Sequence, residues 1–392
     1  MLRRIDSLLC FNEAINDEFS KNSKSNYVRS RDAFGYVAKG QRRVHYFLQQ
    51  DGKAEFIDAW DNIIHLYPPV PAFRDYVPAG GLLPTELQRY LGAVIEYAVV
   101  NGKRPALCEI FSRGRAGALR DAFGGFHIAQ IRDPVSQFGS SFRTLEEVGG
   151  ITFMLIPILE LGVSGNNPLY LLVPEHWRVP VRPWPARDPA QRWASTQQYR
   201  SAIMSPRPDA LETVFRSHLL SWFLNNVVSI IHSDFVLDID KAFDDASYRE
   251  SVRDILRSEL GVAPELSDIT KFSRYYRFDG VDMNRICGEV TDFVFAAQSD
   301  GSLQAALDTL SRASQRVPTS AAIELLGEKL EAALSESASS ACAHRVSAVD
   351  WEAIVQRNRR FWNDPRLLRL MQSIFPFVFP VVQATRRIRS MV

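Results

Sequence analysis

The feature that most constrains the fold is a strand–helix–strand pattern between residues 106 and 131. Residues 106–110 and 127–131 are short apolar runs, which are typical of buried strands. Residues 116–123 between them have helical spacing and are followed by a Gly-Gly pair, a common helix stop. Because a strand, a helix and a strand at this spacing form a right-handed crossover, the pattern predicts an α/β fold with a parallel sheet flanked by helices.

Charged and hydroxyl side chains follow the second of these strands. The strand runs directly into Arg132-Asp133-Pro134, and a further helix is expected to begin near Val135. Arg132 would then lie at the carboxyl end of a strand and beside a helix N-terminus, where open α/β sheets bind anions. Its guanidinium can form a bidentate pair with a phosphate, and the Ser140 hydroxyl two turns along the helix adds a donor. The alternative is an arginine that only ends the strand.

Residues 128–141 read IAQIRDPVSQFGSS. This segment resembles the strand, loop and helix with which sulfotransferases hold the 3′-phosphate of 3′-phosphoadenosine-5′-phosphosulfate (PAPS). In that family an arginine closes the strand and a serine follows eight residues later, positions that correspond to Arg132 and Ser140. Residues 234–262 resemble a later unit of the family, in which a strand and an acidic loop precede a helix ending in Leu-Gly-Val.

The resemblance covers residues 8–262 and implies the sulfotransferase variant of the P-loop fold. It also implies the activity: transfer of a sulfonate group from PAPS to a hydroxyl of a carbohydrate or glycolipid acceptor. PAPS is then the co-substrate, and no metal is implied. The mostly helical C-terminal third of the chain lies outside the resemblance.

Three further residues take their expected roles from this resemblance. Glu13 follows a short apolar strand at residues 8–11, where several sulfotransferases place the general base for the acceptor hydroxyl. Arg113 and Arg115 follow the strand at 106–110 and are the nearest basic groups for a 5′-phosphosulfate. The alternatives are a solvated carboxylate at the start of a helix for Glu13, and a first helical turn with solvent-exposed side chains for the two arginines.

One departure from the family pattern leaves two alternative functions to consider. The family has a phosphate-cradling loop of the form GxxRSGTT before the strand that leads to the glutamate, and this sequence has no counterpart. Either the sequence is truncated at its N-terminus or the loop has been lost, which would leave a binding protein without catalysis. A glycosyltransferase is the second alternative, because Asp238-Ile239-Asp240 has the DxD form of a metal-binding pair. We interpret these aspartates instead as a helix cap and loop hydrogen bonds.

The composition of the chain indicates which classes of partner it lacks and in which cellular compartment it is expected. The chain of 392 residues has 46 Lys and Arg against 45 Asp and Glu, so no basic field points to nucleic acid. Its four cysteines are scattered and lack metal-ligand spacing, as expected of free thiols in a reducing compartment. We find neither a secretory signal nor the uninterrupted stretch of about 18 apolar residues that a spanning helix requires. These features predict a cytoplasmic protein.

Pattern changes along the chain predict its organisation. We expect a sulfotransferase-like α/β domain at residues 1–280, a helical extension at 281–334, a linker of small polar residues at 335–350 and a basic, apolar tail at 351–392. The tail can either lie in the interface of an anionic inner membrane or pack on the main domain. Apolar periodicity also predicts helices at 85–99, 135–145, 151–161, 208–231, 245–260 and 319–334, and a strand at 234–240.

Overall fold

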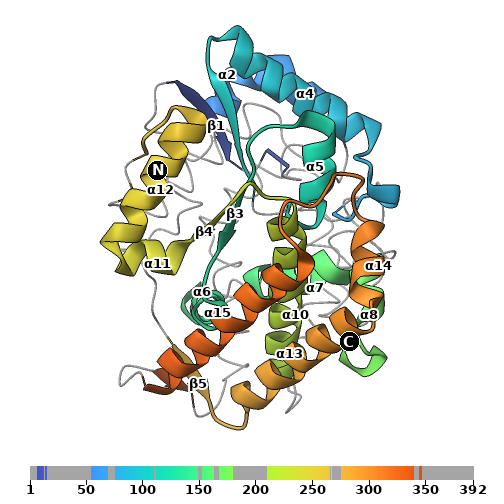
Figure 1. The fold of residues 1–392 in the computed structure, drawn as a ribbon, viewed down its shortest axis with the longest axis vertical. Coiled ribbons are helices and arrows are strands. Elements are labelled where there is room, and N and C mark those ends of the chain that lie inside the picture. Colours follow the sequence, from blue (N-terminus) through green and yellow to red (C-terminus); the bar gives the residue numbers. More distant parts are fainter. Residues whose placement is uncertain are drawn as a thin grey trace, which may run out of the picture.

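The computed structural model of the chain describes residues 7–12, 14–15, 54–68, 76–109, 112–148, 152–162, 167–179, 210–264, 266, 275–339 and 344–346. Within these ranges the fold is mixed α/β, with many helices and three pairs of short parallel strands. Helices surround the strand pairs, and α10 (Ala210–Ile231) runs through the centre (Figure 1).

The strands pair in parallel, two by two. β1 (Leu8–Asn12) pairs with β2 (Arg104–Cys108), β3 (Ile128–Ile131) with β4 (Phe235–Asp238), and β5 (Tyr276–Phe278) with β6 (His344–Val346). All four apolar runs predicted as strands are therefore strands.

The prediction of one continuous sheet is not met in the described ranges, because β2 and β3 are not hydrogen-bonded to each other. Strands of four or five residues form few ladder bonds, so the two pairs are held together by side-chain packing instead. Leu8, Ile128 and Phe235 all pack on one small apolar cluster that includes Leu237 and Leu256.

The strand, helix and strand predicted between β2 and β3 all form, although the two strands belong to different pairs. A 3₁₀ turn, η6 (Arg113–Arg115), leads into α5 (Ala116–Phe123). Gly124 ends this helix with a φ of +62°, a conformation that favours glycine. The predicted helix bounds and its stop are both confirmed.

The remaining helices include those predicted at 85–99, 135–145, 151–161, 245–260 and 319–334, but those at 54–63, 168–172 and 239–244 were not predicted, and the last of these begins inside the strand predicted at 234–240. They are α2 (Ala54–Ile63), α4 (Thr85–Val100), α6 (Pro134–Val148), α7 (Thr152–Gly162), α8 (Pro168–Leu172), α11 (Ile239–Asp244), α12 (Ala246–Leu260), α13 (Met283–Ser299), α14 (Ser302–Asp308) and α15 (Thr319–Ser339). Short 3₁₀ turns complete the set: η4 (Ile64–Leu66), η5 (Ala79–Gly81) and η7 (Glu175–Trp177). None of the helices in the described ranges is long and apolar enough to cross a bilayer.

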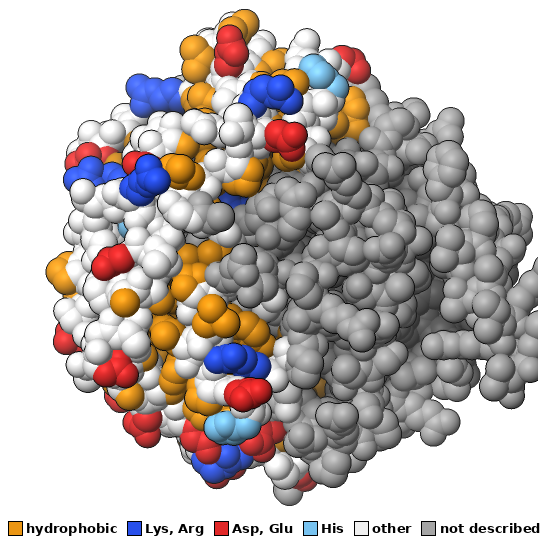
Figure 2. Space-filling view, turned by 90° about the vertical axis from the view of Figure 1, so that its right-hand side faces the viewer, with side chains coloured by type: hydrophobic (Ala, Val, Ile, Leu, Met, Phe, Trp, Pro, Cys, Tyr) orange, Lys and Arg blue, Asp and Glu red, His pale blue; other side chains and the backbone are white. Residues whose placement is uncertain are grey.

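The largest apolar core forms around α10. This helix is rich in Leu, Phe, Val and Ile on every side, so it cannot lie at a surface and is buried among α6, α7, α13 and α15. A second core joins α2, α4 and α5 to β1, with Phe11 fully buried in it. On the face shown in Figure 2, acidic and basic side chains are interspersed over the described surface, in keeping with the near-zero net charge.

The C-terminal part departs from the expected organisation. α15 continues to Ser339, and β6 lies at residues 344–346, where we predicted a linker. The Asp279 backbone N–H donates to the Val346 carbonyl at 2.9 Å, which extends the β5–β6 pairing. The predicted tail at 351–392 lies outside the described residues.

Two glycines in helices lead to opposite predictions for the same substitution. A Cβ at Gly117 would overlap the Ser311 side chain and lie 2.6 Å from His232 Nε2, whereas a Cβ at Gly92 meets nothing within 4 Å. Alanine is the better helix former by about 1 kcal/mol. We therefore expect Gly92→Ala to raise the free energy of unfolding by up to about 1 kcal/mol, and Gly117→Ala to lower it by about 1–3 kcal/mol through overpacking. Urea unfolding of both variants measures the difference, and equal effects would contradict the packing described.

Candidate functional site

The turn between β3 and α6 places Arg132 where the sequence predicts it. β3 ends at Ile131, Arg132 and Asp133 form the turn, and α6 begins at Pro134. Asp133 Oδ1 accepts from the backbone N–H groups of Val135 at 2.7 Å and Ser136 at 3.1 Å. An aspartate cap followed by a proline at the first helical position is a favourable helix start, which explains why α6 begins here. We call residues 132–134 the Arg132 turn.

Helix α10 holds the backbone of the Arg132 turn. Trp222 Nε1 donates to the Arg132 carbonyl oxygen at 3.0 Å, and His218 Nε2 lies 3.0 Å from the Pro134 carbonyl oxygen. Both side chains are buried. Burial lowers the pKa of His218 to about 4, so the imidazole is neutral near pH 7 and donates its Nε2–H to this carbonyl.

The low pKa of His218 predicts a pH dependence of stability. A histidine whose folded pKa lies below its unfolded value of about 6.5 stabilises the fold above that pH, and this contribution is lost as the pH falls toward 4. His218→Gln retains an amide donor for the Pro134 carbonyl but does not titrate. Between pH 7 and 4.5 we expect the variant to lose about 2 kcal/mol less unfolding free energy than the wild type.

Chemical unfolding at a series of pH values tests this expectation, with replacement of the exposed His176 by glutamine as the control. His232 has a pKa lowered to about 4 by burial and by Arg120, so part of the dependence should remain in the variant. Parallel pH profiles for wild type and His218→Gln would contradict the assignment.

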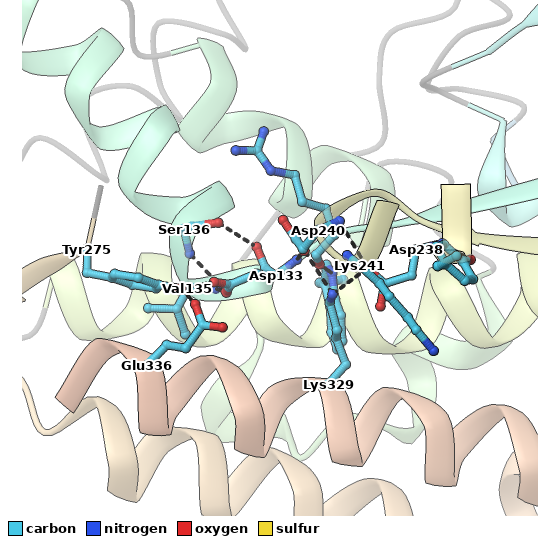
Figure 3. A network of polar contacts seen from close by, with 12 residues as sticks. Asp133, Val135, Ser136, Asp238, Asp240, Lys241, Tyr275, Lys329 and Glu336 are labelled. Atoms are coloured by element: carbon cyan, nitrogen blue, oxygen red, sulfur yellow. Dashed lines mark hydrogen bonds and ion pairs between the residues drawn. The ribbon is translucent and has the colours of Figure 1, made fainter. Parts of the chain in front are cut away.

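A network of carboxylates and one lysine lies beside the turn (Figure 3). Asp240 Oδ2 accepts from the Asp133 backbone N–H at 2.6 Å and lies 2.9 Å from Lys329 Nζ. Lys329 Nζ also lies 2.6 Å from Asp238 Oδ1, which caps α11 by accepting from the Asp240 and Lys241 backbone N–H groups. The interpretation of these aspartates as a helix cap and a loop hydrogen bond is confirmed.

Tyr275 connects the cap of α6 to α15. Its hydroxyl lies 2.7 Å from Asp133 Oδ2 and 2.6 Å from Glu336 Oε2. A phenol has one hydrogen, so it donates to one of these carboxylates at a time. Burial raises the pKa of Tyr275, and both carboxylates add to this effect, so the hydroxyl keeps its proton. Burial also raises the pKa of Asp133, although its hydrogen bonds oppose that change.

Arg113 is paired inside the protein. Its Nη2 lies 2.9 Å from Glu160 Oε2, and Glu160 is fully buried within α7. The same carboxylate accepts from Ser221 Oγ at 2.7 Å and from Asn225 Nδ2 at 3.4 Å, both on α10. Burial lowers the pKa of Arg113, but the Glu160 charge, Tyr76 and the hydrogen bonds to both together raise it more, so the guanidinium stays charged. Arg113 thus anchors the loop after β2 to α7 and α10.

Arg115 is also enclosed by the fold. It is fully buried, and its guanidinium carbon lies 5.6 Å from the centre of the Tyr76 ring, a cation–π distance. The Tyr76 hydroxyl accepts from the Gly114 backbone N–H at 3.1 Å. The alternative that Arg115 extends into solvent is therefore wrong.

The structure brings the loops of Arg113 and Arg132 together on α10. Ser221 binds Glu160, the partner of Arg113, while the next residue, Trp222, binds the Arg132 carbonyl. Ser140 lies further along α6 and is half-buried, as is Arg132. At helical spacing Ser136, Ser140 and Arg143 share one face of α6. Arg143 was missed by the sequence analysis, although its place three residues after Ser140 was a signal.

Glu13 lies outside the described residues. The residues that follow it are held at the end of β2, because the Ile15 backbone N–H donates to the Glu109 carboxylate at 3.2 Å. Ser112 Oγ donates to the same carboxylate at 3.3 Å. Tyr90 Oη donates to the Ala14 carbonyl at 2.9 Å. These contacts fix the chain on the C-terminal side of Glu13.

A pocket of about 430 Å³ is lined by residues around α14 and by His232, which directly follows the C-terminal end of α10, and no residue of the Arg132 turn lines it. No group of three or more His, Cys, Asp or Glu side chains in the described ranges could hold a metal ion. Comparison of the chain with protein-family models, curated proteins and solved structures gives no match.

Proposed function

We propose that the protein binds a 3′-phosphorylated adenine nucleotide at the Arg132 turn and acts as a sulfotransferase on a carbohydrate or glycolipid hydroxyl. One observation carries the proposal: an arginine at the carboxyl end of a parallel strand directly precedes a well-capped helix that bears Ser140 two turns along. The guanidinium and the hydroxyl are groups that bind a phosphate dianion, and the helix contributes only its dipole, because Asp133 already accepts from the Val135 and Ser136 N–H groups.

The chemistry assigns a role to each residue. Arg132 and Ser140 would hold the 3′-phosphate. The acceptor oxygen would attack the sulfur, the bond from sulfur to the bridging oxygen would break, and adenosine 3′,5′-bisphosphate would leave. The acceptor proton would pass to Glu13, whose role rests on the resemblance. We assign no ligand contact to Arg113, because Glu160 already neutralises it.

The glycosyltransferase alternative is less favoured by the contacts of Asp238 and Asp240. In a DxD site both carboxylates face a divalent cation, whereas here both contact the ammonium of Lys329. The alternative of a binding protein without catalysis shares the Arg132 turn with our proposal, and turnover measurements separate the two.

The first test is calorimetric binding of adenosine 3′,5′-bisphosphate to the wild type and to Arg132→Ala. Hydrogen bonds to charged groups contribute about 1.5–3 kcal/mol, so the variant should bind about 10- to 150-fold more weakly. Arg257→Ala, which removes an exposed arginine paired with Asp254, is the matched control and should bind as the wild type does. No binding by the folded wild type, or equal binding by Arg132→Ala, would refute the proposal.

Turnover of PAPS with a panel of carbohydrate acceptors is the second test. Glu13→Gln is expected to retain nucleotide affinity within about threefold and to lower the rate by about 10²- to 10⁴-fold, the usual contribution of a general base. Nucleotide binding without turnover on any acceptor would favour the binding protein instead.

A further inference from the structure

The peptide unit between Arg132 and Asp133 is held from both sides. Its carbonyl oxygen accepts from Trp222 Nε1 at 3.0 Å, and its N–H donates to Asp240 Oδ2 at 2.6 Å. Because a peptide unit is planar, fixing both ends of its dipole fixes the rotation of the plane. The direction in which Arg132 leaves the backbone therefore depends on Trp222 and on Asp240.

Asp240 is in turn held by Lys329. The same Oδ2 atom that accepts from Asp133 lies 2.9 Å from Lys329 Nζ, and the Asp240 side chain is 8% exposed. Lys329 also reaches Asp238, so it is the cation shared by two carboxylates within the described network. Burial lowers the pKa of Lys329, but the hydrogen bonds to Asp238 and Asp240 raise it more, so the ammonium stays charged.

Removal of this ammonium would have two consequences for an anion at the turn. A buried Asp240 without its cation would lose its fixed orientation, and the Asp133 N–H would lose a fixed acceptor. Asp133, Asp238 and Asp240 would also place uncompensated negative charge beside the site, which would repel a phosphate.

We infer that Lys329, on α15, is a positioning residue for the Arg132 turn, acting through Asp240. The inference rests on the proposed function, and it assigns a role in that function to the part of the chain beyond the sulfotransferase resemblance. Figure 3 shows Lys329 and Glu336 both projecting from α15 toward the turn. Glu336 supports the same residue, Asp133, through Tyr275.

The test compares Lys329→Met, which keeps the length of the side chain but removes its charge, with Lys329→Arg. Lys241→Met is the matched control, because Lys241 lies on the neighbouring α11 and its Nζ lies over the Tyr248 ring, 4.9 Å from the ring centre. With adenosine 3′,5′-bisphosphate as the calorimetric probe, we expect Lys329→Met to bind at least about 10-fold more weakly, Lys329→Arg within about threefold of wild type, and Lys241→Met unchanged.

A double-mutant cycle with Asp240→Asn tests the route through Asp240. Asparagine can still accept from the Asp133 N–H but carries no charge, so in that background Lys329→Met should weaken binding by less than about threefold. Equal losses in both backgrounds, or wild-type affinity in a folded Lys329→Met variant, would overturn the inference.

Hydrogen exchange of the peptide that covers residues 132–136 provides a readout without nucleotide. We expect exchange to be at least about 10-fold faster in Lys329→Met than in wild type or Lys241→Met, because the Asp133 N–H loses its fixed acceptor. Faster exchange in a protein whose wild type binds no nucleotide would sustain the positioning role and refute the proposed function. Unchanged exchange would refute the positioning role alone.

Discussion

Replacing Glu160 with alanine is expected to lower the free energy of unfolding by about 3–5 kcal/mol. The carboxylate is fully buried and is the ion-pair partner of Arg113, which retains only 23% of its side-chain exposure. Without Glu160, a mostly buried guanidinium would lack its counter-charge, and Ser221 and Asn225 would lose an acceptor. Urea unfolding followed by circular dichroism measures the loss.

Glu250→Ala is the matched control for this prediction. Glu250 pairs with Arg253 at 2.9 Å, but its side chain is 63% exposed, so we expect a change of less than about 0.5 kcal/mol. A Glu160→Ala loss as small as that of the control would show that Arg113 finds another partner or water. Because Arg113 follows β2, Glu160→Ala should also loosen the loop that carries Arg115.

Replacing Trp222 with alanine is expected to cost about 3–5 kcal/mol of unfolding free energy. Trp222 is 2% exposed and lies in the largest apolar core, so its removal leaves a large cavity. Trp222→Phe reduces the packing loss, because it keeps an aromatic ring, and it removes the N–H that binds the Arg132 carbonyl together with part of the indole volume. That variant should lose about 1–3 kcal/mol, the cost of leaving a buried acceptor unsatisfied.

Stability and ligand affinity together test the role of Trp222. Under the proposed function, Trp222→Phe should weaken adenosine 3′,5′-bisphosphate binding, because the peptide unit between Arg132 and Asp133 loses one of the two hydrogen bonds that hold it. Phe215→Leu, another substitution of a buried aromatic residue on α10, serves as the control for general loosening of the core. An equal effect of both variants on affinity would contradict a specific role of the indole N–H.

The elements that the sequence predicted well are those whose signals are local. The apolar spacing of α10, the Gly stops after α5 and α12, and the aspartate cap before α12 all lie within a few residues of the structure they specify. The pairing of the strands is not local. β1 and β2 are separated by more than ninety residues, so nothing in either run specified its partner.

The contacts of the candidate site were harder to predict for the same reason, although signals existed. Glu160 is a single carboxylate within the otherwise apolar α7, and such a group must find a cation when it is buried. Ser217, Ser221 and Asn225 recur every four residues along the apolar α10, which marks a polar stripe. Both patterns predict that these side chains have buried polar partners, but neither pattern specifies which residues those partners are. Lys329 carried no comparable signal, because lysines are common on amphipathic helices.

The dependence of the Arg132 turn on α15 has a consequence for the order in which the protein matures. Lys329 is synthesised 197 residues after Arg132, and Glu336 later still. On the ribosome, β3, α6 and α10 can assemble while α15 is not yet made, since earlier parts of a chain fold first. The turn would then exist early without its final support. Under the proposed function, a nascent chain is therefore expected to form the turn before it gains affinity for nucleotide.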